Sequence, residues 1–147
     1  MMTHDLFLGM AAGVVFFYLL ILFLGIWLIP AIFYLISMQG ALEAVSPKNR
    51  SLTPGLVWLY LIPLFNLIWQ FFIVVNVSAS LKREYTERQA QNVGDCGYGL
   101  GIAMCIVSVC AIIPILWFFM WVAALILWII YWAKIVELKN GLLATRP

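Results

Sequence analysis

The sequence is poor in charge. Only 10% of its 147 residues are Asp, Glu, Lys or Arg, whereas soluble domains carry roughly 25%. Three long stretches, 6–38, 55–81 and 96–133, contain no charged residue at all. A transmembrane helix needs about 20 consecutive apolar residues. The sparse charge therefore excludes a water-soluble domain and predicts an all-α integral membrane protein.

Residues that carry catalytic chemistry are also scarce. His4 is the only histidine, and it lies outside the three uncharged stretches, so none of these stretches carries an ionisable Asp, Glu, Lys, Arg or His. Ionisable groups within the membrane usually mark proton relays or ion paths, so their absence weighs against a proton-coupled pump. The sequence has no P-loop, HExxH motif, paired carboxylates or nucleophile beside a base. We therefore expect a protein that is not an enzyme, with no catalytic residues and no cofactor.

The cysteines and the basic residues exclude two further classes of site. Cys96, Cys105 and Cys110 have no CxxC spacing and no histidine near them. This pattern argues against a metal site and against a disulfide framework. The Lys and Arg residues form short clusters that flank the apolar runs, as membrane loops do, and we expect no nucleic-acid partner.

Three prolines divide the uncharged stretches. Pro30 is expected to end the first span, after which a helix continues out of the membrane. Pro63 falls within the second stretch, where it should break or kink the helix because it has no N–H. Pro114 is the natural corner of a tight hairpin between the last two helices. We predict one domain over 1–147 with four transmembrane helices, at about 6–29, 55–81, 97–113 and 116–138.

Two amides accompany Pro63 inside the second stretch. Asn66 and Gln70 are four residues apart and therefore share one helix face. Such amides commonly hydrogen-bond between neighbouring membrane helices. The alternative is that they line a pore or a ligand site.

The third and fourth predicted spans each carry a distinctive face. Small residues recur along the third span at Gly97, Gly101, Cys105 and Ser108. A stripe of this kind lets another helix approach closely, so we expect contact with a neighbouring helix or a partner. Tryptophans share one face of the fourth span at Trp117, Trp121, Trp128 and Trp132. They are expected to mark the membrane interfaces or to pack on a partner or a flat ligand.

The distribution of basic residues indicates the orientation, since cytoplasmic loops collect Lys and Arg. Four simple spans with both termini in the cytoplasm place six of the eight basic residues there. A second arrangement makes 55–77 a re-entrant hairpin that breaks at 63–66. It places all eight inside and the N-terminus outside, but it leaves irregular backbone to be covered by protein. We favour four spans, with both termini cytoplasmic, and keep the hairpin as the alternative.

Three segments carry a resemblance to a known family: Glu43-Ala-Val-Ser-Pro-Lys-Asn-Arg50, Pro54-Gly-Leu-Val-Trp-Leu-Tyr-Leu-Ile-Pro-Leu-Phe-Asn-Leu-Ile-Trp69 and Ser80-Leu-Lys-Arg-Glu-Tyr85. From about Glu43 onward the chain resembles a group of uncharacterised bacterial multi-pass membrane proteins, in which similar segments sometimes follow a small GYF-like domain. The resemblance implies a bacterial plasma (inner) membrane and brings no activity or functional residues.

Two functions follow from these observations as hypotheses. The first is a non-enzymatic accessory or scaffold subunit that packs against a larger membrane complex. Its expected partners are the lipid bilayer and either another protein or further copies of the chain. The alternative is a homo-oligomeric pore or small-solute transporter with Asn66 and Gln70 lining the path.

Overall fold

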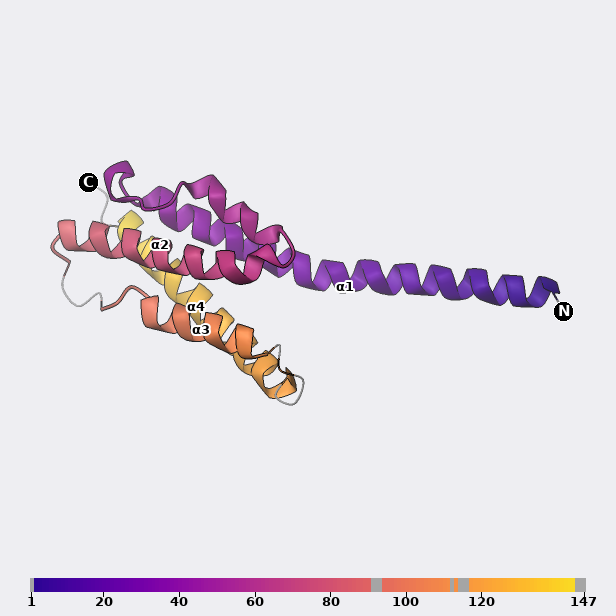
Figure 1. The fold of residues 1–147 in the computed structure, drawn as a ribbon. Coiled ribbons are helices and arrows are strands. Elements are labelled where there is room, and N and C mark those ends of the chain that lie inside the picture. The colour runs from indigo at the N-terminus through magenta and orange to yellow at the C-terminus, as the bar shows by residue number, and fades with distance from the viewer. Residues whose placement is uncertain (1, 91–93, 112, 114–116, 145–147) are drawn as a thin grey trace. The chain divides into compact units, whose positions relative to one another are not determined.

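All regular elements are helical in the part of the chain that the structure describes (Figure 1). The computed structural model describes the backbone of residues 2–90, 94–111, 113 and 117–144. The elements are α1 (Met2–Ala44), the 3₁₀ helices η1 (Pro47–Asn49) and η2 (Pro54–Leu61), α2 (Phe65–Glu87), α3 (Tyr98–Cys110) and α4 (Trp117–Ala144). The prediction of an all-helical protein is confirmed.

Three of these helices have the length and composition to cross a membrane. Within the described residues they cover Phe7–Ala44, Phe65–Glu87 and Phe118–Ala144. The remaining apolar helix, Tyr98–Cys110, is shorter. The structure therefore has three candidate spans where the sequence predicted four, and its apolar helices are consistent with a membrane-embedded protein.

The chain forms two compact units, 1–34 and 35–147. In the first unit α1 is apolar on every side, and its large side chains from Phe7 to Ile29 are exposed. Pro30 lies inside α1, and the helix continues to Ala44. A proline removes one backbone hydrogen bond, yet the remaining ladder carries the helix past it. This matches the expected helical continuation beyond Pro30.

The second unit begins with the last turns of α1 and contains a helical hairpin made by η2 and α2. Ile62, Pro63 and Leu64 separate the two elements, and Leu64 has a φ of +66°. The chain then turns back, so that the indole Nε1 of Trp69 donates a hydrogen bond to the Leu56 carbonyl at 2.9 Å. η2 and α2 thus form two packed limbs over the stretch 55–81, for which the sequence predicted one span broken or kinked at Pro63.

α3 and α4 form a second pair in the same unit, and α3 also packs on α2. Tyr131 of α4 is fully buried, as are Met104 of α3 and both Ile73 and Val77 of α2. α3 ends at Cys110, earlier than the predicted limit of 113. The predicted corner at Pro114 lies outside the described residues. The core of this unit thus sits where α2, α3 and α4 meet.

Candidate functional site

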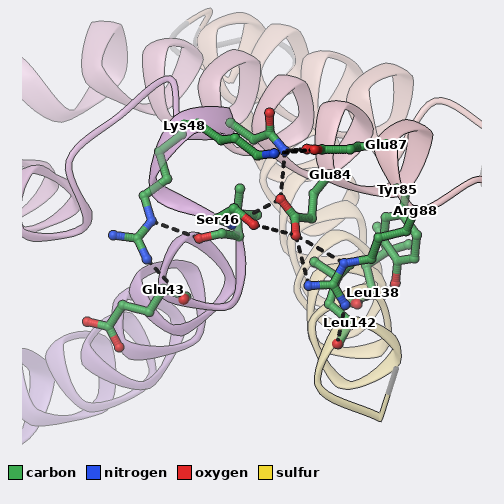
Figure 2. A network of polar contacts seen from close by, with 12 residues as sticks. Glu43, Ser46, Lys48, Glu84, Tyr85, Glu87, Arg88, Leu138 and Leu142 are labelled. Atoms are coloured by element: carbon green, nitrogen blue, oxygen red, sulfur yellow. Dashed lines mark hydrogen bonds and ion pairs between the residues drawn. The ribbon is translucent and has the colours of Figure 1, made fainter. Parts of the chain in front are cut away.

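A buried carboxylate, Glu84, lies at the polar end of the second unit, after the uncharged part of α2 has ended at Leu81. Figure 2 shows the residues around it. Its oxygens accept hydrogen bonds from the Ser46 amide at 3.0 Å, the Ser46 hydroxyl at 2.8 Å and the Asn49 side-chain amide at 2.8 Å. Arg88 donates to it through Nε at 3.0 Å and Nη2 at 2.8 Å. Glu84 is only 2% exposed, and these donors offset the loss of its hydration.

The same cluster joins α2 to the end of α4. Arg88 Nη1 donates to the Leu142 carbonyl at 2.8 Å, and the Tyr85 hydroxyl donates to the Leu138 carbonyl at 2.6 Å. Figure 2 shows both side chains reaching the last turns of α4. One arginine thus holds both the buried carboxylate and a carbonyl of a helix more than 50 residues away.

Arg50 joins the loop at 46–50 to the end of α1 within the second unit. Its Nε donates to the Val45 carbonyl at 3.0 Å and its Nη2 to the Glu43 carbonyl at 3.1 Å. The last carbonyls of a helix have no partner within that helix, so a cation placed there both satisfies and charge-complements them. Nearby, Lys48 forms an exposed ion pair with Glu87. The loop is therefore held at several points.

The hydrogen bonds to Glu84 determine its protonation. Burial alone would raise the pKa of this carboxyl, but donation from Asn49, Ser46 and Arg88 outweighs it and lowers the pKa from 4.5 to about 2. Glu84 is therefore ionised at neutral pH. The pKa of Glu87 is also lowered, chiefly by its hydrogen bond from Lys48.

This cluster bears on the arrangement of four simple spans. That arrangement places the loop at 46–50 and the segment at 82–88 on opposite faces of the membrane. In the structure the loop is hydrogen-bonded directly to Glu84 through Ser46 and Asn49. Within the second unit these two segments therefore lie side by side, at the same end of α2.

The small-residue stripe faces the chain's own helices along part of its length. A Cβ added to Gly101 would lie 2.5 Å from Val74 Cγ1 and 2.8 Å from Tyr131 Cε2, so only glycine fits there. Gly97 lies against Tyr131 and has a φ of +81°, and Cys105 is buried. Ser108 is partly exposed and donates to the Met104 carbonyl of its own helix. From Gly97 to Cys105 the stripe thus serves internal packing.

The two amides beside Pro63 differ in burial. Gln70 is buried at 7% exposure, whereas Asn66 is half-buried near the start of α2. Gln70 therefore points into its own unit and does not present its amide at the outer surface.

The predicted tryptophan face is divided in the structure. Trp121 is 37% exposed, while Trp128 and Trp132 are partly buried with ring centroids 5.2 Å apart. Trp132 Nε1 donates to the Ser37 hydroxyl at 2.8 Å and so ties α4 to the end of α1 within the second unit. The side chain of Trp117 lies outside the described residues.

The local sequence signal for this cluster is the i,i+4 spacing of Glu84 and Arg88, which favours an ion pair on a helix, and the structure contains that pair. The contacts of Glu84 with Ser46 and Asn49 join positions 38 and 35 residues apart, and no local pattern predicts them. No cluster of three or more metal-ligating side chains occurs among the described residues.

Comparison with known proteins adds no assignment. No family model matches the chain, and neither a curated protein nor a solved structure matches it.

Proposed function

We propose that this chain is a non-enzymatic scaffold or accessory subunit of a larger membrane complex. Its second unit inserts into the bilayer as two hairpins, with the turns of the hairpins within the membrane and the polar end of the unit at the membrane surface. One observation carries this proposal. The charged side chains of Glu84, Arg88 and Arg50 are each hydrogen-bonded to another segment of the same chain. Such groups serve to fix the arrangement of helices, which is the task of a structural subunit.

The lengths of the helices support the two-hairpin insertion. η2 has eight residues and would extend roughly 16 Å at 2.0 Å per residue. α3 has 13 residues and would extend roughly 20 Å at 1.5 Å per residue. The hydrocarbon core of a bilayer is about 30 Å thick. Both descending limbs are too short to cross it, which favours turns within the membrane.

The apolar character of the turn regions supports the same insertion. Leu64, at the η2–α2 turn, is 86% exposed, and Phe119, near the start of α4, is 71% exposed. Figure 1 shows the two hairpins opening toward the end of the unit where α2 and α4 finish. Large apolar side chains at the opposite ends would be unfavourable in water but are solvated by lipid.

The orientation follows from the basic residues. With α1 crossing once and both hairpins returning, all eight Lys and Arg residues lie on one side, which we assign to the cytoplasm. The N-terminus is then outside and the C-terminus inside. This proposal replaces the expectation of two cytoplasmic termini. The resemblance described above supports a bacterial plasma membrane.

A partner contact is proposed for the glycine face of α1. Gly9 and Gly13 are spaced as GxxxG, and an added Cβ would meet nothing within 4 Å at either position. This open face suits close approach by another membrane helix. The pore alternative gains no support, because Gln70 is buried within its own unit.

Size-exclusion chromatography with light scattering after mild detergent extraction tests the subunit proposal. The protein should elute in an assembly larger than one 16.7 kDa chain. Gly13→Leu should reduce that assembly, whereas Val14→Leu, one position along the same exposed helix, should not. Elution of the wild type only as a lone monomer would contradict the proposal.

A further inference from the structure

An open groove of about 670 Å³ lies on the second unit beside the Glu84 cluster. Two separate segments supply its cations, one from η1 and two from α2. One carboxylate also lines it. The polar side chains lining the groove are Lys48, Asn49, Lys82, Arg83, Thr86 and Glu87.

The groove lies at the boundary between the apolar and polar parts of α2. Lys82 is the first charged residue after the uncharged stretch 55–81. On the insertion proposed above, on which this inference rests, that boundary lies at the level of the lipid headgroups. Ala79 lines the groove toward the apolar side, and Val75, one turn earlier, is 38% exposed. A headgroup in the groove would thus leave its acyl chain beside apolar side chains.

Two of the three cations keep their charge available. Among the described residues, neither Lys82 nor Arg83 forms an ion pair with a carboxylate. Arg83 Nη1 donates to a neutral partner, the Ser51 hydroxyl, at 3.0 Å. Lys48 is instead paired with Glu87, which neutralises it in part. The groove therefore has an excess positive charge concentrated on α2.

The two walls of the groove are fixed relative to each other. Asn49, on the η1 side, donates to Glu84 at 2.8 Å, and Ser46 donates to the same carboxylate. A ligand bridging η1 and α2 therefore meets donors that are already positioned, which lowers the entropic cost of binding.

We propose that this groove binds the headgroup of an anionic phospholipid from the adjacent leaflet. The Lys82 ammonium and the Arg83 guanidinium contact its phosphate, because both are charge-assisted donors suited to phosphate oxygens. A zwitterionic choline lipid is disfavoured, since its quaternary ammonium would face the same cations. Basic pockets beside membrane helices are suited to anionic headgroups.

Native mass spectrometry of the full chain in non-ionic detergent tests this proposal, with dioleoyl-phosphatidylglycerol and dioleoyl-phosphatidylcholine as the probes. The wild type should retain phosphatidylglycerol in preference to phosphatidylcholine. The double variant Lys82→Gln/Arg83→Gln should lose roughly 25-fold in affinity for phosphatidylglycerol, about fivefold for each cation. The control Lys134→Gln/Lys139→Gln removes the same charge outside the groove and should bind as the wild type does.

A second variant is expected to increase the affinity of the groove for the anionic lipid. Glu87→Gln removes the carboxylate lining the groove and releases Lys48, so its affinity for phosphatidylglycerol should rise. Equal retention of both lipids by the wild type, unchanged binding by the Lys82/Arg83 variant, or displacement of the lipid by millimolar inorganic phosphate would each overturn the assignment. These measurements do not depend on the subunit's assembly state, so their failure is separable from failure of the proposed function.

Discussion

Asn49 and Glu84 are 35 residues apart in the chain, and the Asn49 side-chain amide donates to the Glu84 carboxylate at 2.8 Å. This bond places the loop after α1 beside the polar end of α2. A helix crossing the membrane between the two positions would separate them by the full bilayer. In the two-hairpin insertion that we propose, the chain from 50 to 84 therefore leaves and returns on one side of the membrane.

The variant Glu84→Gln should strongly destabilise the second unit. It removes the charge that Arg88 faces and replaces one acceptor oxygen with a donor amide, which then opposes the donors of Ser46 and Asn49. Removing one partner of a buried ion pair lowers the free energy of unfolding by about 3–5 kcal/mol. Thermal unfolding in detergent, followed by circular dichroism, measures the loss.

Glu137→Gln is the matched control for that variant. Glu137 pairs with Lys134 on α4, but its side chain is 71% exposed. An exposed pair contributes about 0–1 kcal/mol, so this variant should melt close to the wild type. Equal melting of the Glu84 and Glu137 variants would show that the buried cluster does not hold the unit together.

Acid should weaken the same cluster. The pKa of Glu84 falls from 4.5 to about 2 on folding, so its stabilising contribution is fully present above about pH 5 and is lost as the pH falls toward 2. A difference of this size corresponds to about 3 kcal/mol. Melting temperatures measured in detergent should therefore decline as the pH is lowered from 7 to 3. The Glu84→Gln variant lacks this group, and its melting should depend less on pH in the same range; identical slopes would contradict the assignment.

Gly101→Ala should destabilise the contact of α3 with α2 and α4. The added methyl would lie 2.5 Å from Val74 Cγ1, which no packed carbon tolerates. Overpacking of this kind costs about 1–3 kcal/mol. Thermal unfolding should show the loss, and adding Val74→Ala should restore part of it by making room.

Gly55→Ala is the control for the glycine substitution. An added Cβ at Gly55 meets nothing within 4 Å, so this variant should melt as the wild type does. Wild-type stability of Gly101→Ala would mean that α3 does not approach Val74 as closely as the structure places it.

Local composition predicted the helices but not their pairing. Sparse charge and the length of the apolar stretches predicted helical membrane elements, and the glycine at 101 indicated a close helix contact. The return of η2 onto α2 was not predicted as the favoured arrangement, because 55–81 is long enough for one span. The contact of Ser46 and Asn49 with Glu84, which accompanies this return, depends on residues distant in sequence.

Cysteine accessibility tests the insertion of the second unit most directly. Single cysteines at Thr3, Lys48 and Leu64, in a background with Cys96, Cys105 and Cys110 replaced, are treated in intact cells with a membrane-impermeant maleimide. Lys48 suits this test because its side chain is 67% exposed. We predict labelling at position 3, protection at position 48 until the cells are permeabilised, and no labelling at position 64 in either case. Labelling at position 48 with protection at position 3 in intact cells would contradict the account and restore four simple spans.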